Sequence, residues 1–134
     1  LYPVHPNPNI RMVAEKELGD MEGILLCQPQ DYLSFLYLMR RSFLILTDSG
    51  GIQEEAPALG KPALVMREST ERPEALDAGT IRLVGHDPER IVGEAEKLLD
   101  FPEEYRRRCP LANPFGDGSA ARRIADIVLE HLSE

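Results

Sequence analysis

The chain has 134 residues, of which 43% are hydrophobic and 28% are charged, so it can form one globular domain with a core of ordinary size. Fifteen basic and 23 acidic residues give a net charge of -8. This charge repels polyanions and argues against nucleic acid or an anionic membrane as the main partner. Any anion that the protein binds must therefore be held by local donors.

Other compositional features point to a soluble protein. No segment approaches the roughly 18 to 20 continuous apolar residues that cross a bilayer, and the N-terminus lacks the layout of a signal peptide. The two cysteines, Cys27 and Cys109, have neither metal-site nor redox spacing and suit structural thiols in a reducing cytoplasm. The chain opens on a strand-like segment without an initiator methionine, and we expect it to be a fragment.

Short apolar runs alternate with helical patterns along the chain. The predicted strands are residues 1–4, 24–27, 43–46, 63–66 and 80–84. The predicted helices are 8–18, 31–41, 50–59, 73–78, 88–99, a short one that opens at Pro102, and a terminal one over about 119–132. The strands are continuous apolar runs, which predicts an α/β fold whose parallel sheet is covered by helices on both faces.

Polar clusters follow four of the predicted strands. Ligands of such sheets bind outside the carboxyl ends of the strands, so we expect these clusters to converge on one edge. They are His5, 28–30, 48–51 and 67–72.

The segment 47–55, Thr-Asp-Ser-Gly-Gly-Ile-Gln-Glu-Glu, is the strongest indication of a ligand. Ser49, Gly50 and Gly51 leave the backbone uncovered where a strand passes into a helix. The first N–H groups of the helix, together with its dipole, favour a phosphate there, and a diphosphate fits well. Taken on its own, the glycine pair fits an ordinary strand-to-helix turn with Ser49 as N-cap equally well.

Two carboxylates follow this turn. Glu54 and Glu55 both suit the start of a helix because of its dipole, so neither needs a function. A carboxylate about one turn past a phosphate site can also accept hydrogen bonds from ribose hydroxyls. Glu55 is the better candidate for that role.

Four segments occur together in an order that is more specific than any glycine pattern: 3–9 (Pro-Val-His-Pro-Asn-Pro-Asn), 46–57, 70–75 (Thr-Glu-Arg-Pro-Glu-Ala) and 113–118 (Asn-Pro-Phe-Gly-Asp-Gly). They resemble the non-hydrolysing UDP-N-acetylglucosamine 2-epimerase family. The resemblance runs end to end but covers only the C-terminal part of that family's two-domain chain.

The resemblance implies a three-layer Rossmann-like domain of a glycosyltransferase-B-type fold. Residues 1–134 would be the UDP-binding domain without its first strand and helix, and the incomplete sheet would expose an edge or an apolar face. The implied reaction interconverts UDP-N-acetylglucosamine and UDP-N-acetylmannosamine by elimination of UDP to a 2-acetamidoglucal and re-addition. It needs no metal and no nicotinamide, and the full-length enzyme would be a homodimer.

Residue by residue, the resemblance assigns the diphosphate to Ser49 and to the amides of Gly50 and Gly51, and the ribose hydroxyls to Glu55. UDP is the leaving group, so negative charge grows on its distal phosphate oxygen as the glycosidic bond breaks. Donors fixed at that point stabilise the transition state more than the ground state.

The resemblance also assigns uracil to Gln30 and Phe35, and further contacts with UDP to His5, as the catalytic residue, and to Arg72. Without the resemblance, His5 is a turn residue and Phe35 a core residue of its helix. Arg72 would then pair on the surface with one of three neighbouring acids, Glu68, Glu71 or Glu74.

The carboxylates that move protons at C2 in this family lie in the N-terminal domain, which this chain lacks. We therefore expect no epimerisation by the fragment alone. Two alternatives stay open at this point, a UDP-sugar glycosyltransferase of the same architecture and a non-catalytic nucleotide-binding module.

Overall fold

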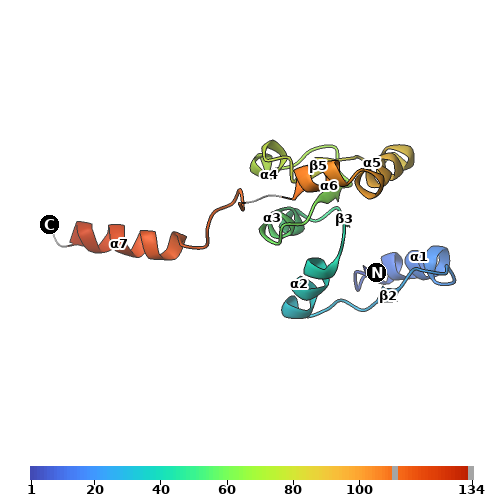
Figure 1. Ribbon diagram of the computed structural model, residues 1–134. Helices are drawn as coiled ribbons and strands as arrows, with labels where there is room; N and C mark the ends of the chain where they lie inside the picture. Colours follow the sequence, from blue (N-terminus) through green and yellow to red (C-terminus); the bar gives the residue numbers. More distant parts are fainter. Residues whose placement is uncertain (110–111, 133–134) are drawn as a thin grey trace. The chain divides into compact units, whose positions relative to one another are not determined.

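The computed structural model describes residues 1–109 and 112–132. The chain divides into two compact units, Leu1–Leu38 and Met39–Glu134. Strands and helices alternate along the chain up to the last strand, three helices follow it, and Figure 1 labels most of these elements. Every strand pair is parallel, which confirms the predicted α/β class. None of the described helices combines the length and the apolar composition needed to cross a bilayer.

The first unit contains a two-stranded sheet. Its elements are β1 (Tyr2–Pro3), α1 (Pro8–Leu18), β2 (Leu26–Cys27) and most of α2 (Tyr32–Arg41). The Asn7 side chain accepts a hydrogen bond from the Asn9 amide at 2.9 Å and so caps α1, which begins at a proline as predicted. β2 is shorter than predicted because the Ile24 amide bonds the Met21 carbonyl in a turn.

The second unit is built on a three-stranded parallel sheet. Its strands are β3 (Ile45–Thr47), β4 (Ala63–Val65) and β5 (Ile81–Leu83), in the order β3-β4-β5. Its helices are α3 (Gly50–Ala58), α4 (Pro73–Asp77), α5 (Pro88–Asp100), α6 (Pro102–Arg108) and α7 (Ala120–Leu132). All three residues of the central strand β4 are buried, as expected for a parallel sheet with both faces covered.

The strands fall into two sheets rather than the single sheet that the sequence predicts. Among the described residues β3 pairs only with β4, so it forms an edge of its sheet. Leu46, in the middle of β3, is 51% exposed. An exposed apolar residue on an edge strand is a surface that a further element could cover, and the expectation of a missing strand stays a prediction.

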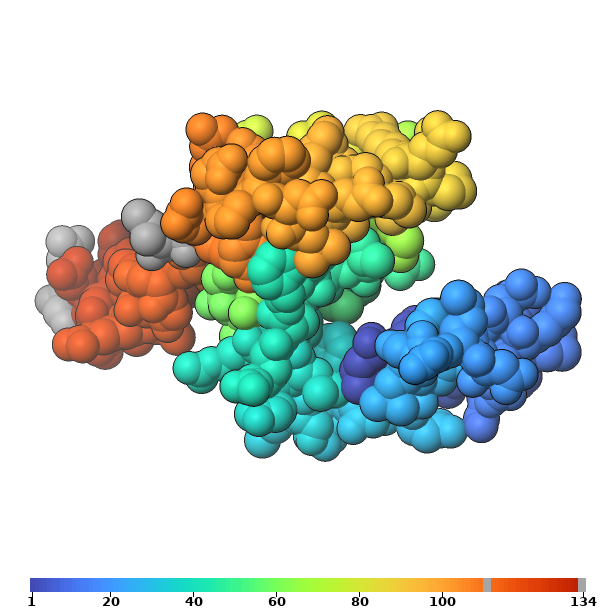
Figure 2. Space-filling model, turned by 45° about the vertical axis from the view of Figure 1, so that its right-hand side comes forward, coloured from blue at the N-terminus to red at the C-terminus, as the bar shows by residue number. Residues whose placement is uncertain are grey.

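The core of the second unit lies between β4 and the helices α5 and α6. It consists of Leu64, Val84 and Leu98, with Ile91 and Ala95 packed against them. The helices α5 and α6 lie side by side, yellow and orange in Figure 2. Side chains alternate along a strand, so Ala63 and Val65 point to the face of the sheet opposite to Leu64. The helix α3 also contacts β4.

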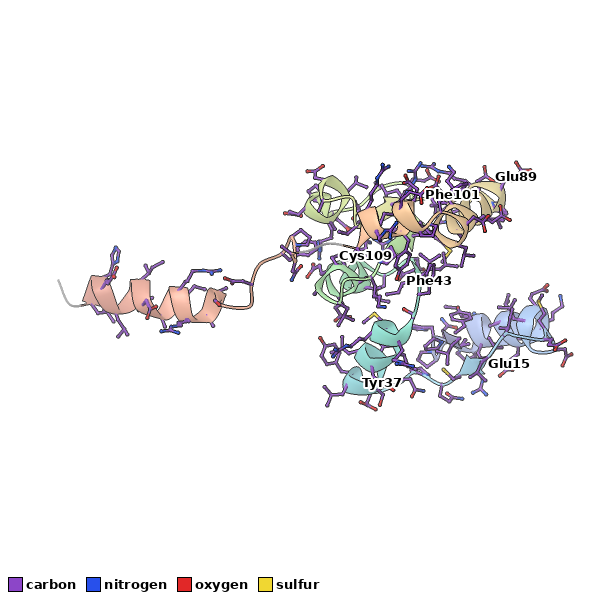
Figure 3. The ribbon with its side chains drawn as sticks, in the orientation of Figure 1. Glu15, Tyr37, Phe43, Glu89, Phe101 and Cys109 are labelled. Atoms are coloured by element: carbon purple, nitrogen blue, oxygen red, sulfur yellow. The ribbon has the colours of Figure 1, made fainter. Side chains whose placement is uncertain are left out.

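Two further contacts attach α6 to this core. The Tyr105 ring stacks on Phe43 at 4.1 Å, and its hydroxyl donates to the Phe43 carbonyl at 3.0 Å; Figure 3 labels Phe43. The buried carboxylate of Glu94 joins three cations, Arg82 at 2.8 Å, Lys97 at 2.8 Å and Arg108 at 3.2 Å.

The charges around Glu94 also set its titration. Burial raises the pKa of Glu94, but the hydrogen bond from Lys97 and the positive charges around the carboxylate outweigh burial and hold the pKa below its ordinary value. Because these cations come from β5, α5 and α6, the ionised carboxylate links three elements of the unit.

The terminal helix α7 agrees with its predicted position within one residue. Before it, Asp117 accepts a hydrogen bond from the Ser119 amide at 2.9 Å and pairs with Arg123 at 3.0 Å. The apolar residues of α7 are largely exposed: Ile124, Ile127, Val128 and Leu132.

Candidate anion-binding site

The turn between β3 and α3 has the geometry that the sequence predicts. β3 ends at Thr47, and α3 begins only three residues later at Gly50. Ser49 occupies the N-cap position in an extended conformation, and its side chain forms no capping hydrogen bond. The Ser49 amide instead donates to the hydroxyl of buried Thr47 at 3.0 Å, which fixes the turn to the end of the strand.

The space beside this turn is open. A Cβ atom placed on Gly50 would meet no atom within 4 Å, and one on Gly51 would meet only the Ser49 hydroxyl at 4.0 Å. The first N–H groups of a helix have no partner within the helix, and its dipole is positive at this end. The turn is therefore not filled by side chains, and an anion can approach its amides and the Ser49 hydroxyl.

The two carboxylates after the turn differ in their surroundings. Glu54 forms an ion pair with the Nε atom of Arg72, so the partner of this arginine is none of the three acids suggested by the sequence. Both side chains are partly exposed, and such a pair contributes at most about 1 kcal/mol. The half-buried Glu55 carboxylate has no hydrogen bond or ion pair within residues 1–109 and 112–132, so it is available to a ligand.

Sequence reasoning missed one residue of this region, Gln53, whose side chain is fully buried. Its Nε2 donates to the Ser49 carbonyl at 3.2 Å, and its Oε1 accepts from the Thr70 hydroxyl. The Thr70 oxygen also accepts from the Arg72 amide at 3.0 Å. The signal in the sequence was its spacing, since Gln53 lies three and four residues before Ala56 and Pro57, on the buried face of the helix.

The first unit carries the other predicted site residues. His5 is exposed and follows β1, and its Nδ1 accepts from the Asn7 amide at 3.1 Å, so Nε2 is the ring nitrogen that remains for a ligand. Gln30 lines a shallow hollow of about 360 Å³, together with Leu33, Ser34, Tyr37 and Leu38.

Phe35 does not line this hollow and is half-buried. Successive residues of a helix are about 100° apart, so Phe35 faces away from the side of α2 that carries Tyr37, labelled in Figure 3. The assignment of Phe35 to a nucleotide base stays a prediction, and Tyr37 is a lining residue that the sequence did not single out.

The structure thus brings part of the predicted site together. Ser49, Gly50, Gly51 and Glu55 share one turn and one helix, and Arg72 is held beside them through Glu54. His5 and Gln30 belong to the first unit, where they follow the carboxyl ends of the paired strands β1 and β2. In the part of the chain that the structure describes, no three His, Cys, Asp or Glu side chains gather as a metal site requires.

Such a turn, followed by an unpaired carboxylate, can bind the diphosphate and the ribose of a nucleotide. A family model described as UDP-N-acetylglucosamine 2-epimerase matches residues 1–129. The chain belongs to the UDP-N-acetylglucosamine 2-epimerase family. The UDP-N-acetylglucosamine 2-epimerase of Escherichia coli strain K12 is 56% identical over 126 residues, which cover 94% of this chain and 34% of that enzyme.

Solved structures of the family agree with the fold. The epimerase of Neisseria meningitidis bound to UDP-N-acetylglucosamine has a TM-score of 0.89 and 47% identity, covering 96% of this chain and 34% of that one. The Methanocaldococcus jannaschii epimerase in complex with UDP-N-acetylglucosamine and UDP has a TM-score of 0.78 and 36% identity, and the match covers 96% of this chain and 34% of that one. The chain therefore spans about a third of the length of its relatives.

Proposed function

We propose that this chain is the UDP-binding portion of a non-hydrolysing UDP-N-acetylglucosamine 2-epimerase. One observation carries the proposal: the turn at residues 49–51 lies at the carboxyl end of β3, with open space beside Gly50. Relatives that were solved with UDP-N-acetylglucosamine or UDP support the choice of nucleotide.

In the proposed complex the Ser49 hydroxyl and the amides of Gly50 and Gly51 bind the diphosphate. Glu55 accepts hydrogen bonds from the ribose hydroxyls, a role supported by the lack of a partner for its carboxylate in the described residues. The other contacts with UDP are assigned as the family resemblance implies, uracil to Gln30 and Phe35, and polar contacts to His5 and Arg72.

The proposed reaction has two stages. A base removes the proton from C2 of the sugar, the C1–O bond to UDP breaks, and a 2-acetamidoglucal forms. UDP then adds back to C1 while a proton is delivered to the opposite face of C2. The groups that carry the C2 proton are expected in the rest of the enzyme.

This chain would act on the leaving group. As the C1–O bond breaks, negative charge grows on the distal phosphate oxygen of UDP, and the donors at the start of α3 stabilise it. His5 can donate a further hydrogen bond from Nε2, because Nδ1 is occupied by the Asn7 amide. This route uses neither a metal nor a nicotinamide.

We further propose that residues 1–134 belong to a Rossmann-like domain whose first strand is contributed by another part of the enzyme. In the doubly wound strand order 3-2-1-4-5-6, the first strand lies between the second and the fourth. A chain without it would pair its first two strands with each other and its last three among themselves. The observed pairings, β1 with β2 and β3-β4-β5, support this proposal. By the same resemblance, we expect the complete enzyme to be a cytoplasmic homodimer.

Isothermal titration of the full-length enzyme with UDP tests the site. We expect Glu55→Ala and Ser49→Ala each to raise the Kd by about tenfold or more, since each removes a hydrogen bond to or from a charged group. Glu96→Ala is the matched control, because this glutamate is exposed on α5. Unchanged affinity in both site variants would refute the assignment.

A second experiment tests the reaction. Full-length enzyme incubated with UDP-N-acetylglucosamine alone should produce the manno isomer, observed by proton NMR. Inertness without an acceptor would contradict the proposal and favour a glycosyltransferase, and UDP binding without turnover would favour a non-catalytic module.

A further inference from the structure

We propose that Gln53 and Thr70 are positioning residues that hold the phosphate-binding turn at 49–51 in register with the loop 67–72, which carries Arg72. The inference rests on the proposed function, because it concerns the geometry of the same UDP site. Neither residue is assigned to contact the nucleotide.

The first step is the tie between Gln53 and the turn. Side chains on a helix point toward its N-terminus, so Gln53 reaches back to the residue four positions earlier. Its Nε2 donates to the Ser49 carbonyl at 3.2 Å, which fastens the N-cap residue to the helix that follows. The Ser49 side chain makes no capping bond, so the hydrogen bond from the Gln53 amide helps to fix the turn in its place.

The second step is the tie to the neighbouring loop. The Gln53 Oε1 accepts from the Thr70 hydroxyl, and the Thr70 oxygen accepts from the Arg72 amide at 3.0 Å. A hydroxyl has one proton, so donation to Gln53 leaves only its lone pairs for the Arg72 amide. The bonds therefore run in one direction, from the Arg72 amide through two side chains to the Ser49 carbonyl.

The third step is the cost of placing these groups where they are. Gln53 is fully buried, and a buried amide without partners is strongly unfavourable, whereas an apolar side chain of similar size would pack there without that requirement. No buried side-chain nitrogen or oxygen among the described residues lacks a partner, so each buried polar atom of the network has at least one hydrogen bond. A satisfied buried network fixes geometry, and this one joins two segments of the proposed site.

The ion pair between Glu54 and Arg72 joins the same two segments at the surface. It is partly exposed and screened by solvent, so it aligns them less firmly than the buried bonds of Gln53. The loss of Gln53 or Thr70 should therefore misplace the donors of the turn relative to Arg72.

The test uses the full-length enzyme and titration with UDP. We expect Gln53→Leu and Thr70→Val each to raise the Kd about tenfold, because each breaks the same chain of bonds. The double variant should lose no more affinity for UDP than either single variant, since the two residues act as one unit. Thr70→Ser retains the hydroxyl and should recover most of the affinity.

Thr80→Val is the matched control. Thr80 is also fully buried, and its hydroxyl donates to the Ala75 carbonyl at 3.0 Å, but it precedes β5 at the opposite end of the sheet. It should lower the melting temperature by a similar amount and leave the Kd for UDP unchanged. An equal loss of affinity in this control would overturn the inference, because it would trace the effect to general destabilisation.

Wild-type affinity in folded Gln53→Leu and Thr70→Val, alongside weakened binding in Glu55→Ala, would overturn the positioning role and leave the proposed function standing. Failure of the wild-type enzyme to bind UDP would overturn the proposed function itself, and this inference with it. If Gln53→Leu does not fold, the positioning role is tested by comparing the Kd for UDP of Thr70→Val with that of Thr70→Ser. Equal Kd values for these two variants would overturn it.

Discussion

The substitution Gly50→Ala should separate stability from nucleotide binding. A Cβ atom at this position meets no atom within 4 Å, and the φ angle of Gly50 is not in the left-handed region, so alanine fits the folded backbone. Glycine inside a helix is less favourable than alanine by roughly 0.5–1 kcal/mol, and less at the first helical residue. We expect the free energy of unfolding to stay unchanged or to rise by up to about 0.5 kcal/mol.

Binding should respond in the opposite direction. The added methyl group occupies the space through which a phosphate oxygen reaches the amides, and the loss of one hydrogen bond to a charged group costs about 1.5–3 kcal/mol. The Kd for UDP should therefore rise roughly tenfold to hundredfold in isothermal titration of the full-length enzyme. Gly93→Ala is the control, since this helical glycine also has open space beside it but lies in α5. Wild-type affinity in Gly50→Ala would refute the reasoning, because no phosphate would then approach this backbone.

Three further predictions concern the stability of the second unit within the full-length enzyme. Glu94→Gln should lower the free energy of unfolding by about 1–3 kcal/mol near neutral pH. The folded-state pKa of Glu94 lies below its ordinary value of 4.5, so its contribution is present above that pH and is lost as the pH falls through the lower folded value. Urea denaturation across pH should show this loss in the wild type and not in the variant. Leu64→Ala, at a fully buried position, should cost about 2–5 kcal/mol in urea denaturation, and a smaller loss would contradict its central place in the core. Tyr105→Phe removes the hydroxyl bond to the Phe43 carbonyl and should cost about 1 kcal/mol, measured as a lower melting temperature.

The sequence predicted the helices well because their ends carry local signals. Pro8, Pro88 and Pro102 each open a helix, as prolines do at the first helical position, and α1 matches its predicted bounds at both ends. The strands were predicted in order but not in length, since only two or three residues of each apolar run pair with a neighbour. Pairing depends on partners distant in sequence, so the division into two sheets was not visible in any local pattern.

The candidate site also combines features that local sequence patterns predict with features that depend on residues distant in sequence. The open turn at 49–51 follows from residue types alone, because small residues between a strand and a helix leave amides uncovered. The partner of Arg72 was predicted wrongly, since the nearby acids in the sequence are not those nearest in space. Gln53 was missed because a polar residue on a helix is usually exposed. Its buried amide is bonded by the Ser49 carbonyl and by Thr70, which comes from a loop distant in sequence.

The adjacent acids Glu54 and Glu55 show how the fold separates roles that the sequence leaves equal. A helix turns about 100° per residue, so one of two neighbouring side chains can face the loop after β4 while the other does not. Glu54 takes that position and pairs with Arg72, which keeps its own charge from opposing an anion at the turn. Glu55 has no such partner among the described residues, so its acceptor oxygens stay available for hydroxyl groups. Glu54 then neutralises Arg72, a cation of the proposed site, and Glu55, one position along the helix, is the acid that we propose for the ribose.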